Sequence, residues 1–207
     1  MTPQKRLFDL VLALVLILLL SPVIVIIALL ILIRDGRPVF YVSERMKAVG
    51  QPFMLWKFRT MRTVARDSGV SGGDKTDRIT ANGRFLRRTR LDELPQLLNI
   101  LRGDISFVGP RPPLRRYVED FPDLYGPVLQ SRPGVTGLAT LIYHRTEERL
   151  LAACSTAEET EAVYRNRCVP AKARLDMIYA RNQSVCFDAV LMLATVFRRL
   201  PLRRRNN

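Results

Sequence analysis

The chain has 207 residues, with 33 Lys and Arg against 19 Asp and Glu, so its formal net charge is +14. This excess predicts an anionic partner, which could be nucleic acid, a membrane surface or a phosphate-rich substrate. His144 is the only histidine, which argues against Ser-His-Asp, Cys-His and multi-histidine metal chemistry. Carboxylates, arginines and lysines are left to carry any reaction.

The first predicted element is an apolar segment from Leu7 to Ile33, interrupted only by Asp9, Ser21 and Pro22. It exceeds the stretch of about 20 apolar residues that a membrane-spanning helix needs. It is too long for the apolar region of a signal peptide and is followed by no small-residue cleavage site. We therefore expect this segment to remain in the membrane.

The residues leave two membrane arrangements equally open. Pro22 removes a backbone donor near the middle of the segment, and Ser21 can bond back to a freed carbonyl. Each half then reaches only about 18 Å, too short to cross a bilayer alone. Basic residues flank both ends, which suits a hairpin that enters and leaves on the cytoplasmic face. A single kinked span is the alternative.

Short elements follow in the remainder of the chain. Residues 39–42 and 53–58 are predicted strands around a turn, and residues 63–82 form a polar loop. Residues 83–88 form a basic amphipathic helix, and a second helix starts at Asp92. Leucines at 94, 97, 98 and 101 lie on one face of that helix, which ends at the predicted cap Gly103.

The C-terminal half is predicted to be mainly helical. Residues 109–113 are proline-rich and extended, and residues 132–137 form a turn. Helix formers dominate residues 147–179, and residues 185–197 form an apolar helix that arginines follow. Without a Gly-x-Gly-x-x-Gly motif after a strand, a Rossmann domain is not expected.

Asp92 and Glu93 are the most informative polar pair. Adjacent helix residues point about 100° apart, so the two carboxylates suit different tasks. At a helix N-terminus, close to Arg87, Arg88 and Arg90, a carboxylate would stay ionised and could lie beside bound phosphate. The alternative is that Asp92 is only an N-cap and Glu93 is solvated. The local sequence leaves both open.

Three further cations have a functional and a structural interpretation. Arg111 lies in a rigid Gly-Pro-Arg-Pro segment, where a guanidinium can grip phosphate with two parallel hydrogen bonds. It could equally be an exposed residue of a linker. Lys57 and Arg59 could bind phosphate or face water from a half-buried strand.

The motifs together resemble the bacterial sugar transferase family, whose small monotopic members are polyprenyl-phosphate phosphoglycosyl transferases. The resemblance runs in order along residues 4–140 and is most specific over residues 91–112. The matching segments are residues 5–9, 21–22, 57–61, 91–96, 103–112 and 132–137.

The resemblance implies a fold, a reaction and a mechanism. The fold is an α-rich α+β catalytic domain at residues 39–207, joined to a re-entrant membrane hairpin at residues 1–38 that breaks at Ser21 and Pro22. Asp92 would attack the β-phosphate of a UDP-sugar and release UMP. Polyprenyl (undecaprenyl) phosphate would then take the phosphosugar in a ping-pong cycle that initiates polysaccharide or glycoconjugate assembly, with Glu93 helping to hold Mg²⁺.

The other substrate contacts are assigned by charge and motif position. Arg111, Lys57, Arg59 and Arg88 are predicted to contact phosphate. After Gly137 the sequence departs from the usual family pattern, and Arg145 is predicted to supply a basic residue there. The expected location is the cytoplasmic face of the bacterial inner membrane, with interfacial amphipathic helices on its lipids.

Other classes of function stay open at this point. No nucleic-acid-reading motif is recognised, so no nucleic acid partner is expected, and homo-oligomerisation is left open. If the chain were an anchored binding protein without catalytic activity, substitution of Asp92 would leave its binding intact. A membrane phosphohydrolase would use water in place of the lipid acceptor. The sugar, the polyprenol length and the pathway are not predicted.

Overall fold

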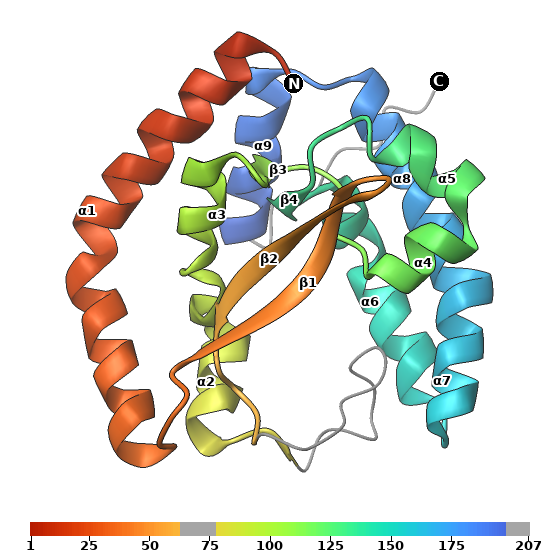
Figure 1. The fold of residues 1–207 in the computed structure, drawn as a ribbon. Helices are drawn as coiled ribbons and strands as arrows, with labels where there is room; N and C mark the ends of the chain where they lie inside the picture. The colour runs from red at the N-terminus through yellow and green to blue at the C-terminus, as the bar shows by residue number, and fades with distance from the viewer. Residues whose placement is uncertain (63–77, 198–207) are drawn as a thin grey trace.

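A computed structural model describes residues 1–62 and 78–197 (Figure 1). A long N-terminal helix is followed by a β-hairpin, a group of short helices and a C-terminal set of helices, which confirms the α-rich α+β prediction. Most of the predicted 63–82 loop and the arginines after residue 197 lie outside the described residues.

The elements of the N-terminal half are α1 (Pro3–Arg34), β1 (Phe40–Ala48), β2 (Gln51–Phe58), α2 (Ala81–Thr89), the 3₁₀ turn η2 (Leu91–Glu93), α3 (Gln96–Arg102) and β3 (Ser106–Val108). Those of the C-terminal half are α4 (Arg115–Asp120), α5 (Pro122–Val128), β4 (Gly134–Thr136), α6 (Leu138–Ala152), α7 (Ala157–Val163), the π-helical η3 (Tyr164–Cys168), α8 (Val169–Arg181) and α9 (Val185–Val196).

The strands form two small sheets. The predicted hairpin is confirmed as antiparallel β1 and β2, and Gly50 takes a positive φ of 72° in its turn. The second sheet is a parallel pair, β3 and β4, in which Ser106 lies opposite Gly134. The sequence predicted only a turn at residues 132–137, because strands this short carry no periodic signal.

Helix α1 is the one helix, among the described residues, with the length and apolar character to cross a membrane; an 18-residue window of it has a mean hydropathy of 3.4 and is 11% buried. It runs through Pro22 without interruption, so the predicted break is not a gap in the helix. Ser21 Oγ donates to Leu18 O at 3.0 Å, which is the predicted bonding back to the backbone. The helix is bowed in Figure 1, as expected where proline removes one hydrogen bond.

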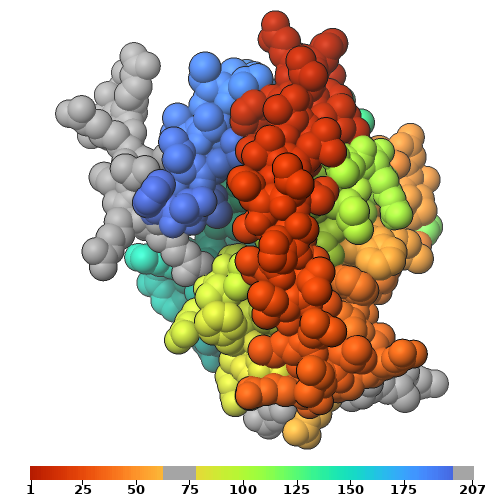
Figure 2. Space-filling view, turned by 90° about the vertical axis from the view of Figure 1, so that its left-hand side faces the viewer, coloured from red at the N-terminus to blue at the C-terminus, as the bar shows by residue number. Residues whose placement is uncertain are grey.

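Both ends of α1 are attached to the rest of the molecule. Near the N-terminus, Arg6 donates to Ile100 O at 2.6 Å and to Leu101 O at 2.8 Å, at the C-terminal end of α3. Near the C-terminus, Ile27 and Ile31 belong to a buried cluster that also contains residues of β2 and α2. Figure 2 shows α1 lying along the length of one face, with Leu14, Leu18 and Leu19 among its exposed side chains.

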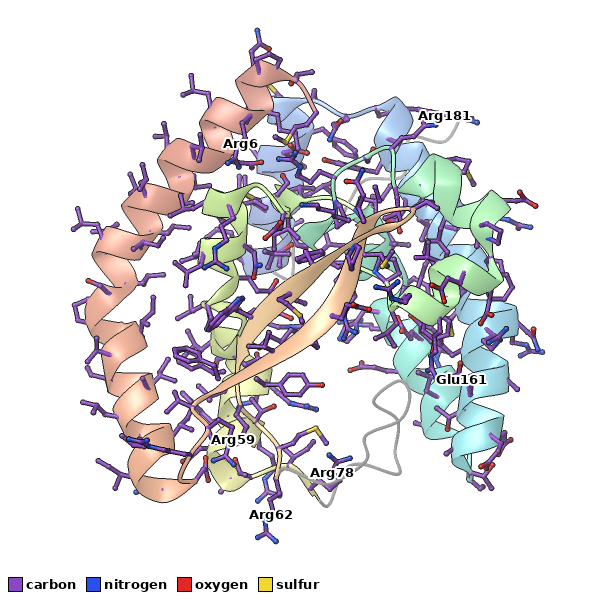
Figure 3. All side chains as sticks on the ribbon, viewed as in Figure 1. Arg6, Arg59, Arg62, Arg78, Glu161 and Arg181 are labelled. Atoms are coloured by element: carbon purple, nitrogen blue, oxygen red, sulfur yellow. The ribbon has the colours of Figure 1, made fainter. Side chains whose placement is uncertain are left out.

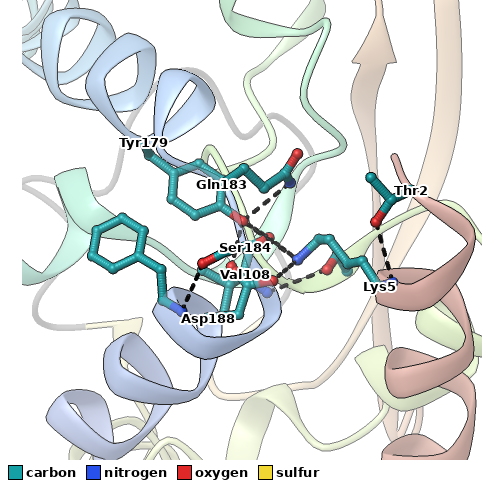
Figure 4. A network of polar contacts seen from close by, with 9 residues as sticks. Thr2, Lys5, Val108, Tyr179, Gln183, Ser184 and Asp188 are labelled. Atoms are coloured by element: carbon teal, nitrogen blue, oxygen red, sulfur yellow. Dashed lines mark hydrogen bonds and ion pairs between the residues drawn. The ribbon is translucent and has the colours of Figure 1, made fainter.

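A buried polar network fixes the first turn of α1 against α9 (Figure 4). Lys5 Nζ forms an ion pair with Asp188 and donates to Val108 O at 3.1 Å. Tyr179 OH donates to Asp188 Oδ1 at 2.7 Å. Lys5 is 2% exposed and Asp188 1%, so this is a fully desolvated pair, which must be closely hydrogen-bonded to be tolerated.

Several predicted helix limits are wrong in detail. The helix predicted over residues 147–179 is divided into α6, α7, η3 and α8, because Thr156 starts a new helix by accepting a bond from Glu159 N at 3.1 Å. The leucine face of α3 is also different, since Leu97 and Ile100 are buried whereas Leu98 is 44% exposed. The apolar helix at residues 185–197 is confirmed as α9.

Candidate active site

A cavity of about 1540 Å³ lies between the β-hairpin, the α2–α3 region and helices α6 and α8. Asp92, Glu93, Lys57 and Arg111 all line it. Four residues from three separate sequence motifs therefore meet in one place, as their predicted common role requires.

The turn between α2 and α3 presents the two carboxylates to the cavity. Helix α2 ends at Arg90, whose φ of 61° is left-handed and whose N–H donates to Arg87 O. The chain then forms η2, which carries Asp92 and Glu93, before α3 begins. Helix α3 is preceded by Pro95 and has no side-chain cap. Asp92 is therefore not an N-cap, and the structural alternative for this residue is wrong.

Glu93 is surrounded by cations. Its Oε1 lies 2.8 Å from Lys57 Nζ, and 3.8 Å from a guanidinium nitrogen of both Arg90 and Arg111. Burial alone would raise the pKa of Glu93, but Lys57 and Arg111 outweigh it and hold that pKa below its ordinary value. Glu93 is thus an ionised carboxylate at neutral pH.

Asp92 has a different environment. It is 7% exposed, and among the described residues its Oδ1 has no hydrogen-bond partner. Burial raises the pKa of Asp92, with Lys57 acting in the opposite direction and Glu93 adding to the increase. The expected lowering of the pKa by the helix end and arginines is therefore wrong for Asp92. The contrast separates the carboxylates: Glu93 forms ion pairs, whereas Asp92 lines the cavity with one oxygen that no described residue hydrogen-bonds.

Close backbone packing positions Arg111. A Cβ at Gly109 would lie 2.1 Å from Arg132 O, and one at Gly134 would lie 2.2 Å from Gly109 N. Gly109 N donates to Thr136 O at 2.9 Å, and Gly134 N donates to Pro110 O at 2.8 Å. Only glycine fits at these contacts, so the Gly-Pro-Arg-Pro segment is held against β4 and presents Arg111 to the cavity.

The other predicted phosphate ligands lie less centrally. Arg59 lines the cavity but is 7% exposed and donates to the carbonyl oxygens of Asp35 and Gly36, the latter at 2.7 Å. It therefore holds the turn after α1, where Figure 3 labels it near the lower end of that helix. Arg88 and Arg145 are exposed residues of the cavity lining, on α2 and α6.

Sequence reasoning did not identify four polar residues of the cavity. Arg45 lies on β1, Glu147 on α6, and Lys172 and Asp176 on α8. None stands in a motif that has chemical meaning on its own. Their spacing along the helices could have shown a shared face, but not that this face meets Arg111.

The donor set of the site suits magnesium bound together with substrate. Among the described residues no group of three or more His, Cys, Asp or Glu side chains could hold a metal. Mg²⁺ typically uses one or two carboxylates and completes its shell with water and substrate phosphates. Within the described part of the chain, the ion-pair contacts of Glu93 with Lys57, Arg90 and Arg111 go through Oε1, and Oδ1 of Asp92 has no partner. The residues fit such a site only if the substrate supplies the remaining ligands.

Comparison with known proteins identifies the family. The family model for bacterial sugar transferases matches residues 1–201. The chain is 37% identical over 198 residues to the UDP-glucose:undecaprenyl-phosphate glucose-1-phosphate transferase of Escherichia coli, an alignment that covers 94% of this chain and 39% of that protein. It is 42% identical over 137 residues to the uncharacterized sugar transferase EpsL of Bacillus subtilis, covering 66% of this chain and 67% of that protein. It is 39% identical over 154 residues to the undecaprenyl-phosphate galactose phosphotransferase of Salmonella typhimurium, covering 65% of this chain and 31% of that protein.

The chain thus spans well under half the length of the enterobacterial relatives that it matches. Their names share undecaprenyl phosphate as acceptor and differ in the sugar, glucose or galactose. The matched region contains the cavity with Asp92 and Glu93. The chain belongs to the bacterial sugar transferase family.

Proposed function

We propose that this protein transfers a phosphosugar from a UDP-sugar to polyprenyl phosphate and releases UMP, through a phospho-Asp92 intermediate. The observation that carries the proposal is the buried carboxylate of Asp92, whose Oδ1 has no hydrogen-bond partner in the described part of the chain, in a cavity lined by Lys57 and Arg111. The names of the relatives support the two substrates.

In the first step, an oxygen of ionised Asp92 attacks the β-phosphorus of the donor. A bond forms between Asp92 and phosphorus, and the bond from phosphorus to the bridging oxygen breaks. UMP departs with the electron pair of that bond. Lys57 and Arg111 are placed to bind the diphosphate and to stabilise the developing negative charge. Glu93 would help to hold Mg²⁺, which neutralises diphosphate charge when it is bound.

In the second step, an oxygen of polyprenyl phosphate attacks the same phosphorus. The bond to Asp92 breaks, and the carboxylate is regenerated as the lipid diphosphate sugar forms. Glu93 is held in an ion pair with Lys57, whereas Oδ1 of Asp92 has no hydrogen-bond partner among the described residues, so Asp92 has an oxygen free to form the covalent bond. The raised pKa of Asp92 also makes it a better nucleophile once ionised than an ordinary carboxylate.

We further propose that α1 enters and leaves the membrane on one face, the cytoplasmic face of the bacterial inner membrane. Lys5 and Arg6 at one end, and Ile27 and Ile31 at the other, contact the same domain. A spanning helix would have to give up the contacts of one end. The exposed leucines between the two ends would then lie in lipid, and the exposed Arg34 and Arg37 at the C-terminal end would face the headgroups.

The transfer reaction is tested with full-length protein in nanodiscs, a panel of UDP-sugars and Mg²⁺. Without lipid acceptor, we expect a burst of about one UMP per enzyme and a phosphosugar adduct detectable by mass spectrometry. Polyprenyl phosphate should restore turnover and discharge the adduct. Asp92→Asn should lose both signals, whereas Asp123→Asn, a substitution at an exposed carboxylate, should retain them.

Each alternative has its own outcome. Sustained hydrolysis of the UDP-sugar to UMP and sugar phosphate without lipid would indicate a phosphohydrolase. A burst in the Asp92→Asn protein would disprove the covalent mechanism. For the membrane arrangement, Gln4→Cys and Arg37→Cys, both at exposed positions, are placed in a Cys186→Ala background. Labelling of Gln4→Cys by an impermeant maleimide in intact cells would show that α1 spans.

A further inference from the structure

A second polar cluster lies on the α6–α8 side of the cavity and has no task in the mechanism above. Lys172 Nζ lies 3.1 Å from both carboxylate oxygens of Glu147, and Tyr164 OH lies within 3.4 Å. The side chains of Lys172 and Glu147 are 12% and 21% exposed. Burial alone would lower the pKa of Lys172, but Tyr164 and Glu147 raise it above its ordinary value. Lys172 is a fixed, buried ammonium.

Asp176 lies one helical turn beyond Lys172 and is incompletely satisfied. It is 6% exposed, and its Oδ1 has no hydrogen-bond partner among the described residues. Burial raises the pKa of Asp176 to about 7. An unpaired buried acceptor destabilises the fold unless a ligand supplies a donor. Its position in the cavity lining makes a bound substrate the natural source of that donor.

Arg111 connects this cluster electrostatically with the catalytic carboxylates. It lies 3.8 Å from Glu93 on one side. Its charge also acts against protonation of Lys57, Lys172 and Arg45. Arg111 is therefore close both to the side of the cavity that carries Asp92 and Glu93 and to the side formed by α6 and α8. In Figure 1, α2 and α3 stand on one side of the β-hairpin, and α6 stands on the other.

The in-line geometry of nucleophilic displacement at phosphorus decides which part of the UDP-sugar reaches the α6–α8 side of the cavity. Attacking and leaving oxygens lie roughly in line through the phosphorus. If Asp92 attacks from the α2–α3 side, UMP must depart away from it, past Arg111 and towards α6 and α8. The phosphate of UMP then needs cations, and its nucleoside offers N–H and O–H donors to a carboxylate.

We propose that the α6–α8 wall is the half-site for the departing nucleoside monophosphate, an inference that rests on the proposed transfer reaction. Lys172 and Arg45 bind the phosphate of UMP, and Asp176 accepts a hydrogen bond from the uridine. Glu147 holds Lys172 in place. The wall thus selects the nucleotide, and the sugar is bound elsewhere in the cavity.

The test measures UMP binding directly, by calorimetry on full-length protein in nanodiscs. Asp176→Ala, which removes the hydrogen-bond acceptor, and the double variant Lys172→Met/Glu147→Gln should each weaken the UMP affinity at least tenfold. The double variant removes both members of the ion pair, so that no buried charge is left alone. Glu158→Gln, at an exposed position on α7, is the matched control and should bind UMP as wild type does.

Steady-state kinetics with the same variants separate the competing explanations. We expect KM for the UDP-sugar to rise at least fivefold while KM for polyprenyl phosphate stays within twofold. Unchanged UMP affinity in folded variants overturns the half-site, and if KM for the donor still rises, the wall binds the sugar. If wild type binds UMP but releases none from any UDP-sugar, the transfer reaction fails, and the calorimetry still decides the half-site.

Discussion

Lys5 tests how strongly the first turn of α1 is coupled to the catalytic domain. Lys5→Met keeps the length of the side chain but leaves Asp188, 1% exposed, without its cation. Removing one partner of a fully buried ion pair costs about 3–5 kcal/mol, because the remaining charge stays desolvated. For a chain of this size that corresponds to a fall in Tm of about 6–20 °C. Thermal unfolding in nanodiscs, followed by circular dichroism, measures it.

The double variant Lys5→Met/Asp188→Asn provides the internal control. The neutral amide can still accept the Tyr179 hydroxyl bond, now 2.7 Å long, and no buried charge is left. We expect the double variant to be more stable than Lys5→Met alone. A double variant whose losses simply add would show that the two side chains do not act as a unit. Activity should also fall in Lys5→Met, since Lys5 holds Val108 O, directly before the segment that carries Arg111.

Three further predictions concern the catalytic cavity. Burial raises the pKa of Asp92, and the charge of Lys57 opposes that rise. In the proposed mechanism Asp92 must be ionised to attack, so activity is lost as pH falls through that pKa. Lys57→Met should therefore move the acid limb of the kcat/KM profile to higher pH. An unmoved limb would mean that Asp92 does not set it. Gly109→Ala places a Cβ 2.1 Å from a backbone oxygen. It should cost about 1–3 kcal/mol of stability and lower kcat about 10²-fold, measured by thermal unfolding and UMP release. The control Gly126→Ala, with open space around the added Cβ, should leave stability unchanged or raise it and should leave UMP release unchanged. Arg111→Lys keeps the charge but loses the planar fork, and should lower kcat/KM about tenfold or more if the contact with diphosphate is bidentate.

Features encoded by neighbouring residues could be predicted from the sequence. Hydrophobic runs around Gly50 predicted the hairpin, and Gly103 predicted the end of α3, where it takes a φ of 82°. Asp92 and Glu93 were identified because two adjacent carboxylates stood among arginines in a specific motif. Their different pKa directions were not predicted, because burial depends on what the fold places over each of them.

Contacts between distant segments were not predictable. Lys5 and Asp188 are separated by 183 positions, and nothing near either residue indicates the other. The parallel pairing of β3 with β4 and the cluster around Lys172 depend in the same way on tertiary packing. Gly109 and Gly134 are present in the sequence motifs, but the close approach of two backbone segments that requires glycine at both positions could not be predicted from them.

The contacts that attach α1 are also the contacts that build the site. At one end, Lys5 holds the backbone immediately before the Arg111 segment. At the other, Arg59 binds the turn after α1; it directly follows β2, which carries Lys57, the partner of Glu93. If the exposed face of α1 lies in lipid, the membrane therefore fixes both sides of the diphosphate pocket at once. A lipid-borne phosphate would then meet the cavity at a depth set by α1, which explains why an enzyme with one water-soluble and one membrane substrate would combine anchor and active site in a single structural unit.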